Sequence, residues 1–297
     1  MERKKRIIAM GFFDGVHRGH QALLELTKKR AYELGVVPAI ITFDTPPKYT
    51  VTGKAPPLIN TPYDRAEIVK QYTGIDDIIF LHFDERLMRM HWDLFLDWMI
   101  DDFDACGFVA GYNFKFGYQG DGNSEKLMQK SRQAGVSCDI VPRVELGGTR
   151  ISSSLIRKLI TDGQMKKAVQ LLGHPHILTE TVRYGYRFGR KLGFPTVNMK
   201  IPDGVICPRH GVYAAKVMIP GEGTHLAVTN VGVRPTVGGT DDVSVESHIL
   251  DYNGDLYGRR LTVEFYEHLR DEIKFNETDE LKSQIARDAA KTRELLS

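Results

Sequence analysis

The sequence of 297 residues predicts two domains of different fold class. The first is an α/β domain with a parallel sheet and helices on both faces, and the second is a small antiparallel β-barrel with a C-terminal helix. Short apolar runs alternate with helix-like segments in the first half, which is typical of a parallel sheet. After residue 172 several strand-like segments follow one another through glycine-rich connections, which is typical of a barrel. In that half, the long helical pattern begins only at residue 277.

The first half is expected to begin with a buried strand and a helix that ends at Gly35. Apolar residues in this helix recur at the spacing of one helical face, whereas the strands are short continuous apolar runs. We expect strands at residues 7–10, 36–43, 78–83, 106–110 and 136–141, and helices at 20–34, 62–72, 92–100 and 124–134.

The second half is expected to contain strands whose two faces differ. In the segment 243–250, Val245 and Ile249 share one face, whereas Glu246 lies on the other. The run LLGHPH at residues 171–176 breaks the preceding helix and is taken as the junction, which gives domains at 1–172 and 177–297. We expect strands at 177–184, 211–218, 226–231, 243–250 and 261–265 and a helix at 277–296.

Composition excludes several classes of function. Lysine and arginine number 40 against 38 aspartate and glutamate, so the net charge of +2 does not indicate a nucleic-acid or membrane-surface partner. No apolar stretch approaches the length of a membrane span. The three cysteines are isolated, with no spacing typical of a metal site or a disulfide framework. We therefore expect a cytoplasmic protein, and nothing in the sequence indicates an oligomeric state.

The run GFFDGVHRGH, residues 11–20, lies where the first strand turns into the first helix. Ligands of parallel sheets bind beyond the carboxyl ends of the strands. Glycines there allow close approach of the backbone, and the helix N-terminus attracts an anion. His17 and His20 are three residues apart and therefore share a helix face, from which both could donate hydrogen bonds to phosphate oxygens.

A run of three serines precedes a further helix. The hydroxyls of Ser152, Ser153 and Ser154 can cap this helix and hold phosphate, with Arg157 one turn further along. A serine cap alone is a common structural device, so this pattern gains meaning only beside the other motifs.

Five motifs together resemble a known family. GFFDGVHRGH resembles the signature of nucleotidyltransferases that carry an H-x-G-H motif, which have a Rossmann-like domain. GYNFKFG (111–117) and ISSSLIR (151–157) are similar to the second and third motifs of the prokaryotic FAD synthetases. GYRFGRKLGFPTVN (185–198) and VESHILDYNGDLYG (245–258) resemble flavokinase motifs. The whole chain thus resembles the prokaryotic bifunctional riboflavin kinase/FAD synthetases.

For the first domain, the resemblance implies transfer of an adenylyl group from ATP to FMN, which gives FAD and pyrophosphate. His17 and His20 would stabilise the α-phosphate, and Arg157 would hold the departing phosphates. Residues implied to bind nucleotide or phosphate are Gly11, Phe12, Asp14, Gly19, Asn113, Ser152, Ser153 and Ser154. Residues implied to bind the flavin end of FMN are Phe43, Asp44, Pro57 and Asn60.

For the second domain, the resemblance implies phosphorylation of riboflavin to FMN by ATP. Glu246 would be the general base that takes the proton of the terminal ribityl hydroxyl. Thr196 and Asn198 offer oxygen ligands for Mg²⁺, a hard ion. The glycine-containing flap over ATP would comprise Gly185, Gly189, Lys191 and Gly193.

Departures from the family pattern lie in the first domain. The run FDTPP (43–47) stands where the family usually has Phe-Asp-Pro-His-Pro, so a histidine is missing from a loop implied to hold FMN. Three alternative functions are a kinase-only enzyme, a flavin-binding regulator with an impaired adenylyltransferase, and a cytidylyltransferase. The cytidylyltransferase explains only the first motif.

Overall fold

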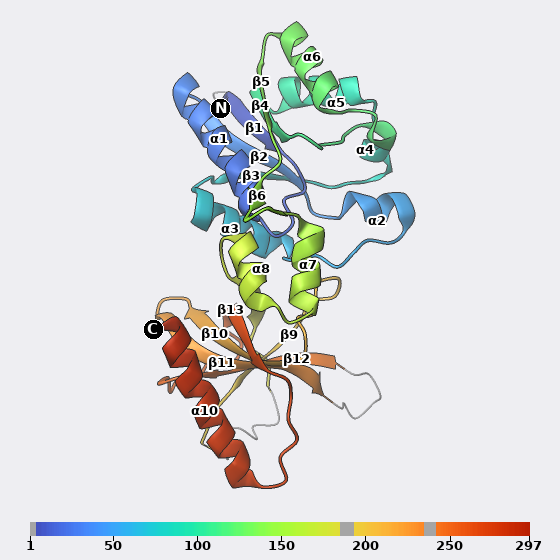
Figure 1. Ribbon diagram of the computed structural model, residues 1–297. Coiled ribbons are helices and arrows are strands. Elements are labelled where there is room, and N and C mark those ends of the chain that lie inside the picture. The colour runs from blue at the N-terminus through green and yellow to red at the C-terminus, as the bar shows by residue number, and fades with distance from the viewer. Residues whose placement is uncertain (1–3, 185–192, 235–241) are drawn as a thin grey trace. The chain divides into compact units, whose positions relative to one another are not determined.

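The computed structural model describes residues 4–184, 193–234 and 242–297 (Figure 1). The chain divides into two compact units. The α/β unit comprises Met1–Pro57 and Arg65–Ser152, and the barrel unit comprises Leu58–Asp64 and Ser153–Ser297.

The α/β unit is built on a parallel sheet of five strands in the order β3-β2-β1-β4-β5. The strand order reverses between β1 and β4, because β1 pairs with β2 on one side and with β4 on the other. The connections that follow β1 and β4 therefore diverge at the carboxyl ends of these two strands, and sheets of this kind bind ligands there. The strands are β1 (Arg6–Met10), β2 (Val37–Phe43), β3 (Asp77–Leu81), β4 (Ala105–Gly111) and β5 (Ser137–Val141).

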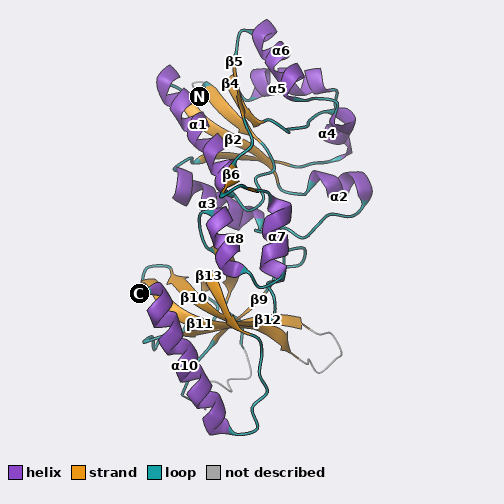
Figure 2. Ribbon diagram, in the orientation of Figure 1, coloured by secondary structure: helices purple, strands orange, loops and turns teal. Residues whose placement is uncertain are grey.

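Helices cover both faces of this sheet (Figure 2). Ile8 and Phe108 point into a cluster that includes Phe95 and Met99 of α5 and Leu127 of α6. Their neighbours along the strands point to the other face, which α1 covers. The helices that lie wholly in this unit are α1 (Arg18–Leu34), α2 (Pro47–Thr52), α4 (Glu85–Arg89), α5 (Trp92–Asp102) and α6 (Ser124–Ala134). A 3₁₀ turn at Tyr118–Gly120 and a hairpin of β6 (Glu145–Leu146) and β7 (Thr149–Arg150) complete the unit.

The barrel unit contains six antiparallel strands in the order β8-β13-β10-β11-β12-β9. The N–H of Arg183, just after β8, donates to the carbonyl of Asn198 on β9 at 2.8 Å, which brings the two edges of the sheet together. The strands are β8 (His176–Thr181), β9 (Val197–Lys200), β10 (Gly211–Ile219), β11 (Gly223–Arg234), β12 (Asp242–Ile249) and β13 (Arg260–Arg270). The predicted fold class is confirmed for both halves.

Three helices belong wholly to the barrel unit: α7 (Ser153–Thr161), α8 (Met165–Leu172) and α10 (Thr278–Leu296). The C-terminal helix α10 packs on β10 and β11, where Ala289 meets Val212 and Val228. Helix α8 packs on β8 and β13. By packing, α7 and α8 thus belong to the barrel unit. The sequence predicts that the first domain ends at residue 172, after both helices, and this boundary stays a prediction.

A short segment of the first half, Leu58–Asp64, also belongs to the barrel unit. The Leu58 N–H donates to the Gly204 carbonyl, and the Leu58 carbonyl accepts from the Ile206 N–H, both at 2.8 Å. The Tyr63 ring lies 3.8 Å from the guanidinium carbon of Arg260. Helix α3 (Pro62–Thr73) begins in this segment and continues in the α/β unit.

Candidate active sites of the two units

The H-x-G-H motif forms the turn between β1 and α1. His17 is the N-cap of α1, and its Nδ1 accepts a hydrogen bond from the backbone N–H of His20 at 3.2 Å. The turn needs backbone in the left-handed region at Phe13 (φ 52°), Gly15 (φ 84°) and Val16 (φ 38°). A positive φ at a buried β-branched residue such as Val16 is strained, and such strain concentrates at functional sites.

The two imidazole rings stack on one another. Their centroids are 3.6 Å apart and their planes differ by 14°. Since His17 Nδ1 accepts a hydrogen bond, the neutral ring carries its proton on Nε2 and can donate there. Gly19 makes room for this ring, because a Cβ at residue 19 would lie 3.2 Å from it.

His20 is held in its neutral form. Burial lowers its pKa well below the usual value, and electrostatic interactions with His17 and Arg65 lower it further. The Nδ1 atom of His20 is buried with no hydrogen-bond partner among the described residues. Neither the stack nor the surroundings favour a positive charge on His20, so this arrangement offers N–H donors rather than charged groups to an anion.

The carboxyl ends of three adjacent strands bring predicted residues of the first domain to one edge of the sheet. Phe43 ends β2, Gly11 follows β1, and Asn113 follows β4, with β1 paired to both neighbours. Phe12 is half-buried, Asp14 is buried and Asn113 is exposed. Asp44 lies beside β3, where its carboxylate pairs with His82 Nδ1 at 2.9 Å; this contact lowers the Asp44 pKa against the opposing effect of partial burial.

Arg65 is a charged residue near this edge that the sequence analysis missed. It lies on α3, is 1% exposed, and donates from Nη1 to the Phe43 carbonyl at 2.8 Å and to Thr42 Oγ1 at 3.0 Å. Burial lowers its pKa to about 10, against the opposing charges of Asp14 and Asp44. No motif contains Arg65, and an arginine on an amphipathic helix usually faces solvent, so the sequence carried no signal for it.

Several residues predicted for the first site belong to the barrel unit by packing. Asn60 is buried in the segment Leu58–Asp64, whereas Pro57 is the last residue before it. Helix α7 begins at Ser153, so the predicted position of the serine run at a helix start is confirmed. Ser152 ends the α/β unit, and Ser153, Ser154 and Arg157 lie in the barrel unit. Their place beside the histidines stays a prediction.

In the barrel unit, the structure brings Asn198 and Glu246 together. They are direct partners in the antiparallel pairing of β9 with β12, so their side chains share one face of the sheet. Asn198 is buried, and Glu246 is half-buried, on the opposite side of β12 from the buried Val245 and Ser247. The alternation predicted for this strand is confirmed.

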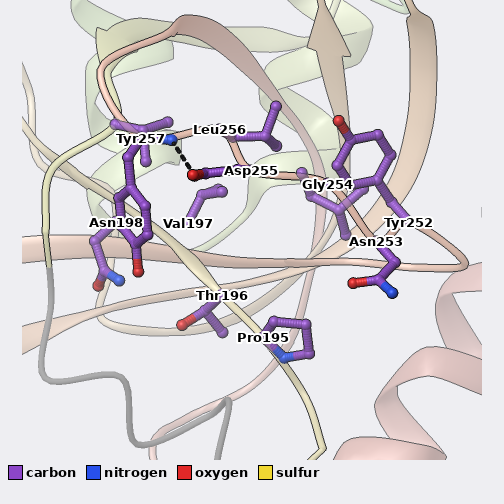
Figure 3. A pocket seen from close by; sticks show the side chains of 12 residues that line it. Pro195, Thr196, Val197, Asn198, Tyr252, Asn253, Gly254, Asp255, Leu256 and Tyr257 are labelled. Carbon is purple, nitrogen blue, oxygen red and sulfur yellow. Dashed lines mark hydrogen bonds between the residues drawn. The ribbon is translucent and has the colours of Figure 1, made fainter.

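A pocket of about 260 Å³ lies beside Asn198 (Figure 3). Thr196 and Asn198 line it together with the loop from Tyr252 to Tyr257, in which the Tyr257 N–H donates to Asp255 Oδ1 at 3.1 Å. The Tyr257 ring stacks on Tyr184 with centroids 4.3 Å apart. The hydroxyl of Thr196 and the amide oxygen of Asn198 are oxygen ligands of the kind that a hard cation such as Mg²⁺ prefers. Water and phosphate oxygens usually supply most of the other ligands of this ion.

Not all predicted residues of this site can be placed. Gly185, Gly189 and Lys191 lie outside the described residues, whereas Gly193 is an exposed glycine in the left-handed region (φ 89°) just before Thr196. For the loop from Tyr252 to Tyr257, the sequence predicts only a turn within a family motif. This loop lines the pocket because the chain brings it next to β9, and a contact between segments so far apart cannot be predicted from local sequence patterns.

Within residues 4–184, 193–234 and 242–297, no three His, Cys, Asp or Glu side chains form a group that could hold a metal ion. Among the helices so described, none combines the length and the apolar character needed to cross a membrane.

Two family models match the chain, FAD synthetase over residues 1–155 and riboflavin kinase over residues 172–296. A bifunctional riboflavin kinase/FMN adenylyltransferase from Pseudomonas fluorescens is 35% identical, with 99% of this chain and 94% of the relative covered. The relative of the same name from Listeria monocytogenes is 32% identical, with 97% and 91% covered.

Among solved structures, a crystal structure from Streptococcus pneumoniae described as a macrolide-efflux protein matches with a TM-score of 0.87 and 30% identity, over 99% of this chain and 95% of that one. The two consecutive family models and the near-complete coverage of curated relatives agree with the two units seen in the structure. The chain therefore belongs to the bifunctional riboflavin kinase/FMN adenylyltransferases, enzymes that phosphorylate riboflavin and adenylylate FMN.

Proposed function

We propose that the two activities of this family are carried by separate residue sets, one centred on His17 and His20 of the α/β unit and the other on Asn198 and Glu246 of the barrel unit. As a member of the family, the chain acts on riboflavin, FMN and ATP. The observation that carries the proposal is the pairing of Asn198 with Glu246 across β9 and β12, beside a pocket that Thr196 also lines.

In the barrel unit, Glu246 is the general base. Its carboxylate accepts the proton of the terminal ribityl hydroxyl while that oxygen attacks the γ-phosphate of ATP, and ADP leaves. Thr196 and Asn198 hold Mg²⁺, which neutralises charge on the phosphates when bound. The pocket beside them takes the nucleotide, and Gly185, Gly189, Lys191 and Gly193 are assigned to ATP by the family motif, the first three lying outside the described residues.

In the α/β unit, a phosphate oxygen of FMN attacks the α-phosphate of a second ATP. The bond between the α- and β-phosphates breaks, and pyrophosphate leaves. His17 and His20 donate hydrogen bonds to the oxygens on which negative charge accumulates, so they stabilise the transition state without taking a proton or forming a covalent bond. Arg157 and Ser152, Ser153 and Ser154 hold the departing pyrophosphate.

The remaining residues bind the substrates. Gly11, Phe12, Asp14, Gly19 and Asn113 surround the nucleotide, since they lie at the carboxyl edge of β1 and β4. Phe43, Asp44, Pro57 and Asn60 hold the flavin end of FMN. We further propose that the FMN adenylyltransferase domain ends near residue 172, that the kinase domain spans residues 177–297, and that the enzyme works in the cytoplasm, in keeping with three free cysteines.

Two substitutions separate the activities. Glu246→Gln keeps the size of the side chain and removes the base, so we expect no FMN from riboflavin but normal conversion of supplied FMN to FAD. His20→Ala should slow adenylyl transfer by roughly 10²–10³-fold and leave the kinase intact. The products of riboflavin or FMN with Mg-ATP are resolved by chromatography.

The control for the first substitution is Glu264→Gln, a half-buried glutamate on β13 outside the proposed site. A Glu246→Gln enzyme that phosphorylates riboflavin at the parent rate would show that Glu246 is not the base. If the parent enzyme accumulates FMN and forms no FAD, the chain is a kinase alone, and the departure at Thr45, Pro46 and Pro47 is the first place to look.

A further inference from the structure

We infer that Arg65 is a positioning residue for adenylyl transfer, because it joins the loop after β1 to the end of β2 and places a buried positive charge beside the imidazole pair. The inference rests on the proposed role of His17 and His20. It concerns a residue that lies in none of the sequence motifs.

The contacts of Arg65 link two loops that are expected to hold different substrates. Its Nη1 donates to the Phe43 carbonyl and to Thr42 Oγ1, at 2.8 and 3.0 Å. Thr42 Oγ1 in turn donates to the Phe12 carbonyl at 2.9 Å. The guanidinium carbon also lies 4.4 Å from the centroid of the Phe12 ring. One side chain thereby fixes the distance between Phe12, on the nucleotide side, and Phe43, on the flavin side.

The charge of Arg65 is costly where it lies. The side chain is almost fully buried, and Nε and Nη2 have no hydrogen-bond partner among the described residues. The carboxylates of Asp14 and Asp44 favour the charged form of Arg65, while the carboxylate of Asp44 pairs with His82. A buried guanidinium without a close counter-ion destabilises a fold. An unbranched apolar residue would fill the same space without this cost, so the charge itself has a use in the site.

That use is to keep His20 uncharged. Among the described residues, His17 on the turn into α1 and Arg65 on α3 act electrostatically on His20. Asp14, on the loop after β1, and Asp44, after β2, act on Arg65. The positive charge of Arg65 disfavours the imidazolium form of His20, in the same direction as burial and His17. Two stacked rings can then work together as neutral donors, without mutual repulsion.

The test compares Arg65→Lys, which keeps the charge, with Arg65→Met, which keeps most of the volume. Arg30→Met is the matched control, since Arg30 lies in the same unit but pairs with Asp139 at the surface. For each protein we would measure KM for FMN and kcat for adenylyl transfer between about pH 5 and pH 9, and riboflavin phosphorylation by the same sample. The kinase reports whether each preparation is folded and active at its other site.

Both variants should raise KM for FMN by about tenfold, since neither reproduces the planar contacts with Phe12, Thr42 and Phe43. In Arg65→Met alone, the acidic limb of the pH profile should move to higher pH by about half a unit or more, because His20 protonates more readily. Kinase activity should stay within about twofold of the parent, as for Arg30→Met.

The inference is overturned if Arg65→Met keeps the parent KM for FMN, or if its pH profile matches that of Arg65→Lys. The second result would show a structural role without an electrostatic one. A failure of the proposed function looks different: His20→Ala would then transfer the adenylyl group at the parent rate, whatever the Arg65 variants do.

Discussion

At the scale of single residues, His176 makes the stability of the barrel unit depend on pH. It is 2% exposed at the start of β8, packs against Phe265 with ring centroids 5.7 Å apart, and has no hydrogen-bond partner for Nδ1 among the described residues. Burial, with a smaller effect of His174, lowers its pKa to about 3. Because the unfolded chain titrates near pH 6.5, it binds a proton that the folded chain does not between these two values.

Stability that depends on neutral His176 is therefore complete above about pH 6.5 and declines as the pH falls toward 3, by up to about 1.4 kcal/mol per unit. When the pH is lowered from 7 to 5, the unfolding free energy of the parent should fall. In His176→Leu we predict that this fall is smaller by about 2 kcal/mol. Urea denaturation of the full chain at both pH values measures this. His210→Leu, at an exposed site, should follow the parent; equal acid sensitivity in the parent and His176→Leu would contradict the prediction.

Residues of the two sites were predictable to different degrees. The spacing of His17 and His20 sufficed for their shared face, because helix geometry is local, and the alternation along β12 sufficed to place Glu246 away from the core. Arg65 and the loop from Tyr252 to Tyr257 were not predictable. Their roles depend on contacts between segments far apart in the chain, which no local pattern contains.

At the scale of elements, the C-terminal helix α10 is anchored by a buried ion pair. Asp288, with a side chain 6% exposed, accepts from Arg270 Nη2 on β13 at 2.7 Å and also from Gln284 Nε2 on its own helix at 2.8 Å. The apolar contacts of Ala289 with Val212 and Val228 lie beside it. The pair therefore fixes the rotation of α10 on the sheet as well as its attachment.

We predict that Asp288→Asn lowers the unfolding free energy by about 1–3 kcal/mol, because it leaves the Arg270 guanidinium without its counter-ion in a half-buried place. Denaturation of the full chain, followed by circular dichroism, gives the value. The control is Asp251→Asn, which breaks the exposed pair with Arg293 of the same helix. Because this pair is exposed, and because asparagine tolerates the positive φ of residue 251 (58°), the loss of unfolding free energy in Asp251→Asn should be much smaller. Equal losses in the two variants would refute the anchor.

Most elements, but not their partners, followed from the sequence. Long periodic helices such as α1 and α6 and the buried strands β1, β2 and β4 were placed within two residues, since their apolar patterns are strong. The sequence does not predict the strand β9, because it has only four residues and begins shortly after Gly193 and Pro195. The strand order and the pairing of Asn198 with Glu246 depend on how distant strands assemble into the sheet. The sequence of a single segment does not determine this assembly.

At the scale of the whole molecule, the chain folds into two compact units, and one short segment of its first half belongs to the second unit. Leu58–Asp64 is part of the barrel unit by packing, although both flanking stretches belong to the α/β unit. The sequence 1–152 therefore contains the whole α/β unit together with a short segment that packs with the barrel unit. A sequence-based boundary could not show this, because Leu58 pairs with Val205, 147 positions further along the chain.

A final prediction concerns the product that links the two activities. Neither step needs a covalent enzyme intermediate, so FMN is held only by non-covalent contacts and can dissociate between the two steps. We predict that a mixture of the Glu246→Gln and His20→Ala proteins converts riboflavin to FAD, although neither variant does so efficiently alone. The His20→Ala protein supplies FMN, and the Glu246→Gln protein adenylylates it. Chromatography of timed samples should show FMN rise and then fall as FAD forms. FMN that accumulates in the mixture without FAD, while Glu246→Gln still adenylylates supplied FMN at the same concentration, would mean that FMN is not released in a usable form.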